Sequence, residues 1–323
     1  MTGYVIRRLL LMIPTFLLVT LVVFLCVRFI PGDIVEIMVG EIGMDALVDP
    51  DEVRKKIRTA LGLDVPIHIQ YGRWVSGMFL HGSLGISLRT QKPVLAQLVE
   101  KLPVSLELGG IAVITALLIA VPIGVFSAVR QDTWGDYAGR TVAIVFICLP
   151  SFWLGTMIVV YPSIWWAWVP ALEFIPFSED PKGNLIQFLI PGGILGMVLS
   201  GSTMRMTRTM MLEVLRQDYI RTAWSKGLKE RIVIFRHAMK NALIPVVTIV
   251  GLLLPVLIGG TVIVEQIFSL PGMGRLLMQA LNQRDYPMLS GLNVFLATFV
   301  LIVNLLIDLT YAWLDPRVHY RKN

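Results

Sequence analysis

Few residues in this chain of 323 could do chemistry, and no catalytic motif brings them together. The sequence has no Gly-Lys dipeptide, so it has no phosphate-binding loop of the G-x-x-x-x-G-K-[ST] type that could hold ATP. The H-E-x-x-H and G-x-S-x-G motifs are absent as well. The four histidines are too scattered for a metal cage: His68, His81, His237 and His319. The sequence therefore predicts no catalytic residue, no metal site and no cofactor in this chain.

A second group of candidates comprises polar residues within apolar runs, which are costly in lipid and usually face a bundle interior or a cavity. Asn293, Asn304 and Asp308 fall within about 60° of one another at 100° per helical residue, a spacing suited to lining a path. Asp308 and Glu107 each lie near the end of an apolar run. We interpret both carboxylates as snorkelling or helix-pairing groups rather than as an ion relay. Whether either one contacts a substrate stays open.

The composition places these residues in a membrane protein. Hydrophobic residues make up 55% of the chain, charged residues only 15%, and the mean hydropathy is +0.73, which is too apolar for a soluble globule. A helix needs about 20 apolar residues to cross the hydrocarbon core. Six runs qualify: Leu9–Ile30, Pro103–Val129, Tyr137–Tyr161, Leu185–Thr203, Ala242–Val264 and Leu289–Leu314. The predicted fold class is an all-α polytopic membrane protein, with the fourth run weakest because Pro191 and two glycines interrupt it.

Charge placement predicts the orientation of these six helices. With the N terminus inside, the cytosolic pieces are 1–9, 130–140, 205–241 and 315–323, and the external pieces are 28–102, 162–186 and 265–288. The cytosolic pieces hold 16 Lys and Arg in 66 residues, and the external pieces hold 12 in 124. This excess agrees with the positive-inside bias and puts both termini in the cytosol. The first run is too long for a signal peptide and has no cleavage site, so we expect a permanent helix that ends at Pro31-Gly32.

One predicted cytosolic piece is strongly basic. The segment from Arg205 to Lys240 contains nine Lys and Arg but only three acidic residues. We interpret Arg205, Arg208 and Arg216 as charges that set topology, and the rest of the loop as helical stretches that need a partner surface. The net charge of +6 then gives no reason to expect a nucleic-acid partner.

The external pieces also contain helix signals. Asp49, Pro50 and Glu52 predict a helix start, and Gly62 its end; a second helix is expected from about Pro66 to Leu80. After the fifth apolar run, Pro271-Gly272 breaks the chain and a short amphipathic helix is predicted over 273–281. Two interpretations of this helix remain: it lies at the membrane interface, or it dips toward the mouth of a path.

The segment D-Y-I-R-T-A-W-S-K-G at 218–227 resembles the EAA loop of importer permeases of the ATP-binding-cassette (ABC) class. The resemblance extends over RHAMKNALIPVVTIVG, VEQIFSLPGMGRLL, QRDYP, RRLLLMIPTFLLVTLVVFLCVRFIPGD, LGLDVPIHIQYGRW, HGSLGISL and PVLAQLVEKLP. Nearly the whole chain is thus similar to the dipeptide, oligopeptide and nickel permeases, in their first-subunit (B-type) branch. Arg221-Thr222-Ala223 stands where Glu-Ala-Ala is usual, and Pro245 falls later than the common proline; both departures are typical of the peptide branch.

This resemblance implies a type I ABC importer permease fold, with a first transmembrane helix at 1–30, an external segment at 31–98, a permease domain at 99–314 and a cytosolic tail at 315–323. It implies the permease subunit of an ATP-driven peptide importer, which forms half of the translocation path. ATP and Mg²⁺ would bind in separate ATPase subunits. Its implied partners are a homologous second permease, two ATPase subunits, a substrate-binding protein, the peptide and the lipid bilayer. The location would be the inner (plasma) membrane of a bacterium or archaeon.

The resemblance also implies a coupling helix at about Asp218–Lys226, lying in a groove of an ATPase subunit. Ala223 would be small enough to let this helix seat closely, and Gly227 would take the turn that ends it. The implied coupling residues are Asp218, Tyr219, Arg221, Thr222, Ala223, Trp224, Lys226 and Gly227.

Two other functions remain as alternatives. One is a self-contained secondary transporter or channel for small polar solutes, and the other is a membrane enzyme. The cargo is also open between dipeptides, longer peptides, glutathione, a nickel chelate and a sugar-like compound. The loop between Tyr161 and Leu185 is short for a dipeptide permease.

Overall fold

The computed structural model describes residues 2–29, 35–36, 39, 50–60, 62–171 and 173–314, and these residues are mainly helical. They form two compact units. Unit 1 contains residues 101–276 and the chain from 302 onward, and unit 2 contains residues 2–100 and 277–301. Three helices, α5, α12 and α13, each contain residues of both units.

Unit 2 carries the helices that precede the main bundle in sequence. Its elements are α1 (Thr2–Arg28), α3 (Pro50–Ala60), α4 (Ile67–His81), the start of α5 (Val94–Val129) and much of α13 (Tyr286–Leu314). The two helices predicted between residues 49 and 80 are confirmed as α3 and α4. Asp49, Pro31 and Gly32, which were expected to cap one helix and end another, lie outside the described residues. α1 and α4 meet at Tyr71, whose ring packs edge-on against Phe24 and whose hydroxyl lies 3.0 Å from that of Thr20.

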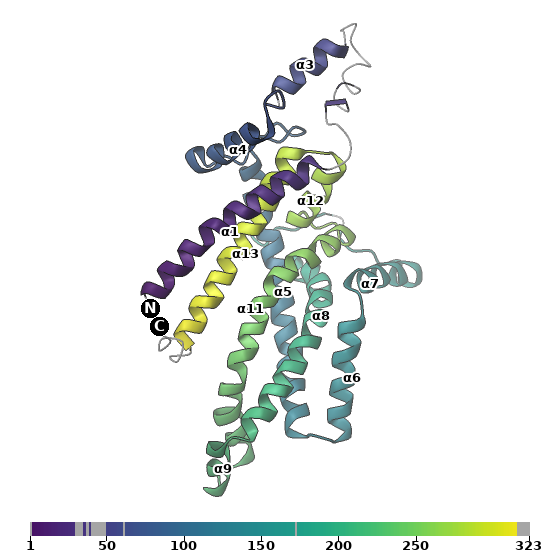
Figure 1. Cartoon of the computed structure of the whole chain (residues 1–323). Coiled ribbons are helices and arrows are strands. Elements are labelled where there is room, and N and C mark those ends of the chain that lie inside the picture. The colour runs from purple at the N-terminus through teal and green to yellow at the C-terminus, as the bar shows by residue number, and fades with distance from the viewer. Residues whose placement is uncertain are drawn as a thin grey trace. The chain divides into compact units, whose positions relative to one another are not determined.

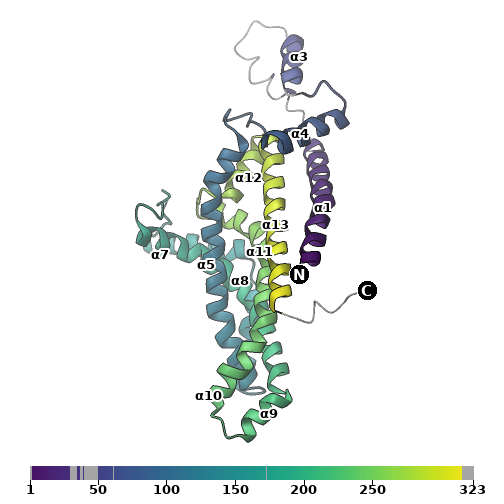
Figure 2. The same ribbon diagram turned by 90° about the vertical axis from the view of Figure 1, so that its left-hand side faces the viewer.

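Unit 1 is a bundle of long helices. It adds α6 (Trp134–Cys148), α7 (Ser151–Trp166), α8 (Pro181–Leu215), α9 (Asp218–Ser225), α10 (Glu230–Ile232), the π-helical stretch η1 (Val233–Ala238), α11 (Met239–Ile267) and the start of α12 (Met273–Asn282). Figures 1 and 2 show α8 running alongside α5 and α11, with α9 at one end of this bundle. The core between these helices includes Leu108, Phe188, Leu195 and Val264, all buried.

The membrane spans agree with the sequence in number but not in shape. Five described helices are long and apolar enough to cross a membrane, and a sixth span results if α6 and α7 count as one. These two helices meet at 89°, so the apolar run predicted over Tyr137–Tyr161 is a bent pair of helices rather than a single straight one. The bend falls at Leu149-Pro150 because proline disfavours the helical conformation in the residue before it and has no N–H to donate.

The sequence predicted that Pro191 and two glycines interrupt the fourth apolar run, and this interruption does not occur. Pro191 lies inside the continuous helix α8. The glycine after it serves packing, since a Cβ on Gly192 would come within 2.5 Å of the Ile111 side chain on α5. A Cβ on Gly196, one turn later, would come within 2.6 Å of the Thr115 side chain of α5. Small residues let the two helices approach closely, as is common in membrane bundles, and this packing maintains α8 through the proline.

Candidate functional site

The candidate site is α9, the short helix at the end of the unit 1 bundle (Figure 1). α8 ends at Leu215, Gln217 is extended with ψ 149°, and α9 then begins at Asp218, where a carboxylate in the first turn favours the helix. Gly227 follows α9 with φ +74°, and its N–H donates to the Trp224 carbonyl at 2.9 Å. The structure confirms both the helix predicted near 218–226 and the glycine turn that closes it.

One face of α9 packs inside unit 1. Ile220 and Ala223 lie three residues apart, hence on one side of the helix, and they are 0% and 7% exposed. They belong to a cluster with Met211 of α8, Val125 of α5 and Val233 of η1. The prediction that Ala223 seats against a partner is therefore wrong: its small side chain allows α9 to approach its own chain.

The opposite face of α9 is open. Tyr219 and Trp224 are 42% and 43% exposed, and their polar neighbours are exposed as well: Asp218, Arg221, Thr222, Lys226 and Gly227. Tyr219 is held in place, because Asn241 Nδ2 on α11 donates to its hydroxyl at 2.8 Å. Arg221 makes a 3.6 Å ion pair with Asp218 on the same helix. We call this face, formed by these seven residues, the outer face of α9.

A buried ion pair joins three helices near the same end of unit 1. Arg208 of α8 donates through Nε and Nη2 to the two carboxylate oxygens of Asp136 on α6, each at 2.7 Å. Ser127 of α5 donates to the same carboxylate, which is 0% exposed. Arg208, interpreted from the sequence as a topology-setting charge, thus has a structural partner, whereas Arg205 is exposed. Sequence analysis missed Asp136; the available signal was an acid two residues after the start of an apolar helix.

A second buried carboxylate lies near the other end of α11. Glu265 accepts hydrogen bonds from the Ser105 hydroxyl at 2.6 Å and from the N–H of Arg275 at 2.9 Å. The Ser105 hydroxyl in turn accepts from the Met273 N–H at 2.8 Å. Glu265 therefore caps the N terminus of α12. Any Cβ at Gly272 would overlap its carboxylate, which explains a glycine in the Pro-Gly-Met-Gly segment. Sequence reasoning saw the chain break but missed this acid.

The predicted path residues are not brought together by any contact that the structure shows. Asn293 donates from Nδ2 to the Leu289 carbonyl of its own helix at 2.8 Å, and Asn304 is half-buried in α13. The side chain of Asp308 lies outside the described residues. Glu107 is half-buried and lies 3.5 Å from Asn184 Nδ2 on α8, in agreement with a helix-pairing role.

Among the described residues, no group of three or more His, Cys, Asp or Glu side chains is placed to hold a metal ion. The outer face of α9 likewise contains no base positioned beside a nucleophile. Its chemistry is that of a contact surface: exposed aromatic rings with cations around them, the composition of binding hot spots.

Comparison with known families agrees with this picture. Residues 120–320 match the family described as the binding-protein-dependent transport system inner membrane component, and residues 1–109 match the N-terminal region of such a membrane component. This chain belongs to that family. It is thus the inner-membrane permease component of an ABC transport system, as its resemblance to importer permeases implied, and a multi-pass membrane protein.

Individual relatives of this permease match along its full length. It is 38% identical over 345 residues to the dipeptide transport system permease protein DppB of Escherichia coli, with all of both chains covered. Identity to the dipeptide permease protein of Alkalihalophilus pseudofirmus is 38% over 347 residues, covering 99% of this chain and 100% of that protein. A Brucella suis protein named as belonging to a peptide transport system is 39% identical over 320 residues, covering 99% and 100%.

The fold also recurs in a solved structure. A crystal structure of an amino acid ABC transporter with histidines superimposes with a TM-score of 0.50, covering 69% of this chain and 94% of that one. The two sequences are 13% identical, so this likeness concerns the fold alone. It supports the predicted ABC permease fold, which a helical membrane bundle by itself would not specify.

Proposed function

We propose that this permease imports peptides and is driven by separate ATPase subunits that dock on the outer face of α9. The observation that carries the docking is the two-sided structure of that helix: Ile220 and Ala223 attach it to the bundle, while Tyr219 and Trp224 remain exposed. Aromatic side chains with neighbouring cations are typical anchors of protein interfaces. Peptides are the proposed cargo because the relatives in Escherichia coli and Brucella suis are named for them.

The rest of the transport system follows from the family. A homologous second permease would complete the path, and a substrate-binding protein would deliver the peptide at the external side. ATP and Mg²⁺ would be bound by the two ATPase subunits. The α9 end of unit 1 would face the cytosol, together with both termini, since residues 205–241 carry nine Lys and Arg, the most of any piece predicted to be cytosolic.

The proposed mechanism is alternating access. Closure of the ATPase pair on binding ATP would move the docked α9. Because Ile220 and Ala223 share one buried cluster with Val125 of α5 and Met211 of α8, α9 cannot shift far without those two helices. The Asp136–Arg208 pair would pass the same movement to α6. Polar residues of α13, Asn293, Asn304 and Asp308, are proposed to line the path that these helices open and close.

The docking is tested by Gly227→Asp in the complex purified with its endogenous partners. A Cβ at Gly227 meets nothing within 4 Å, so the first atom of the new side chain has open space, although the φ of +74° strains any residue that carries a side chain. We expect the variant to reach the membrane at normal levels, while uptake of labelled dipeptides falls at least tenfold, because an anion would face the ATPase groove. The measurement is dipeptide uptake in proteoliposomes at saturating ATP.

The matched control is Gly82→Asp. Gly82 also has a positive φ, +61°, and open space around its Cβ, so the substitution brings the same backbone strain and charge to α4. Uptake in this variant should stay within about twofold of the wild type. Equal uptake in both variants would contradict docking at α9, and loss of uptake in both would assign the effect to backbone strain.

A further inference from the structure

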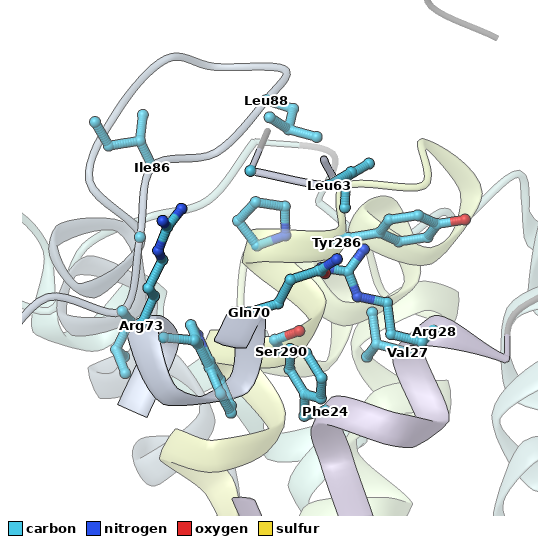
Figure 3. Close-up of a pocket in the computed structure, with 15 residues that line it drawn as sticks. Phe24, Val27, Arg28, Leu63, Gln70, Arg73, Ile86, Leu88, Tyr286 and Ser290 are labelled. Carbon is cyan, nitrogen blue, oxygen red and sulfur yellow. The ribbon is translucent and has the colours of Figure 1, made fainter. Parts of the chain in front are cut away.

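Unit 2 contains a cavity whose lining residues have no role in the proposed function. Its volume is about 330 Å³, within the range of small-molecule sites. The walls come from the end of α1, from α4, from the loop between α4 and α5, and from the start of α13 (Figure 3). Most of the wall is apolar, with Phe24, Trp74 and Leu84 among its side chains.

Two guanidinium groups line this cavity. Arg28 comes from the last turn of α1 and Arg73 from α4, and Figure 3 shows them on either side of Gln70. In the part of the chain that the structure describes, neither arginine has an ion-pair partner. Arg28 lies over the Phe24 ring, 5.3 Å from its centroid. Arg28 is half-buried and Arg73 is exposed, and two guanidinium groups that line an apolar cavity favour an anionic ligand.

The side chain of Gln70 indicates that the ligand also carries a hydrogen-bond donor. Its Nε2 donates to the Val65 carbonyl at 2.7 Å, but its Oε1 is buried and has no hydrogen-bond partner among the described residues. An unsatisfied buried acceptor is costly, and each such group calls for an explanation. A ligand that carries a hydroxyl donor beside its anion would satisfy Oε1 and neutralise the arginines together.

The position of the cavity indicates where such a ligand comes from. The apolar span of α1 runs from Ile6 to Arg28, so Arg28 lies where the helix leaves the hydrocarbon core. Phe24 packs on Tyr71 and Trp74 of α4, with ring centroids 5.5 and 5.8 Å away, and Tyr and Trp gather at this depth. Phe29, next to Arg28, is 80% exposed. The cavity is therefore at the level of lipid headgroups, beside a surface suited to acyl chains.

We propose that this cavity binds one phosphatidylglycerol molecule. Its phosphate lies between Arg28 and Arg73, a headgroup hydroxyl donates to Gln70 Oε1, and its chains follow the apolar surface at the end of α1. The lipid then holds α4 against α1 in every transport state. The assignment does not depend on which side of the membrane unit 2 faces.

The test is native mass spectrometry of the purified complex after exchange into defined lipids. The wild type should retain phosphatidylglycerol over phosphatidylethanolamine, which has no net charge, by roughly 25-fold, since each of the two basic residues contributes about a fivefold preference for an anion. The Arg28→Gln/Arg73→Gln double variant should lose this preference, and the corresponding double lysine variant should keep it. Lys55→Gln, which removes an exposed cation of α3, is the matched control and should bind like the wild type.

A second comparison isolates the hydroxyl. Phosphatidylmethanol has the same charge as phosphatidylglycerol but no headgroup hydroxyl, so the wild type should prefer phosphatidylglycerol severalfold and Gln70→Met should bind the two equally. Unchanged phosphatidylglycerol retention in the double glutamine variant would overturn the site. Displacement of the lipid by millimolar glycerol 1-phosphate would overturn it too, because the cavity would then take a soluble anion.

Discussion

Two carboxylates in unit 1, Asp136 and Glu265, are fully buried, yet they are held in different ways. Asp136 faces a cation, because Arg208 binds both of its oxygens. Glu265 faces neutral donors, the Ser105 hydroxyl and the N–H of Arg275. The first connects three separate long helices near the α9 end. The second orders the turn from the end of α11 into α12 and connects this turn to Ser105 of α5.

The difference shows what each end of the bundle needs. Near α9, the helices must stay in register if they are to move as one body, and a bidentate ion pair sets both distance and orientation. At the end of α11 the chain reverses sharply, and a carboxylate at a helix N terminus satisfies backbone N–H groups that lipid could not. Removing one partner of a buried charged pair costs more stability than removing a neutral donor, because the remaining charge stays buried.

The largest effect expected from this comparison is that of Arg208→Met. The substitution leaves the Asp136 carboxylate buried without its cation, which costs about 3–5 kcal/mol. We expect a large fall in the thermal stability of the purified complex and in the amount that reaches the membrane. Arg205→Met, three residues earlier on the same helix and exposed in the wild type, should stay within about 0.5 kcal/mol. Equal losses in both variants would show that the ion pair has no special role.

A smaller effect is expected at the neutral site with Ser105→Ala. The hydroxyl donates to Glu265 and accepts from the Met273 N–H, so its loss leaves two buried groups each short of a partner, at about 1–3 kcal/mol. Thermal unfolding of the complex measures this change. The control is Ser163→Ala, because that exposed hydroxyl bonds only to the Val160 carbonyl of its own helix. A loss as large as that of Arg208→Met would remove the distinction between the two ends.

The sequence predicted most of the fold because its strongest signals are local. Apolar length identified the spans, and Gly227 correctly marked the end of α9. Pro150 and Pro191 misled because the effect of a proline depends on what packs beside it. Gly192 and Gly196 let α8 pack closely against α5, and the helix continues through Pro191. At Pro150 the chain bends instead, between α6 and α7.

The candidate site was predicted in position but not in orientation. The resemblance implied both a short helix at about 218–226 and its role. It could not show that Ala223 faces the bundle, since that depends on packing against Val125 of α5 and Met211 of α8. The Asp136–Arg208 and Ser105–Glu265 contacts were missed for the same reason: their partners are 72 and 160 residues apart.

The central claim is that the outer face of α9 touches an ATPase subunit, and photo-crosslinking in the assembled complex tests it most directly. A photoreactive amino acid replaces Trp224 in one variant and Phe177, exposed in the loop before α8, in the other. The account predicts a crosslink from position 224 to an ATPase subunit, and none from position 177. A crosslink from position 224 to lipid or to an external binding protein, with no ATPase adduct, would contradict it.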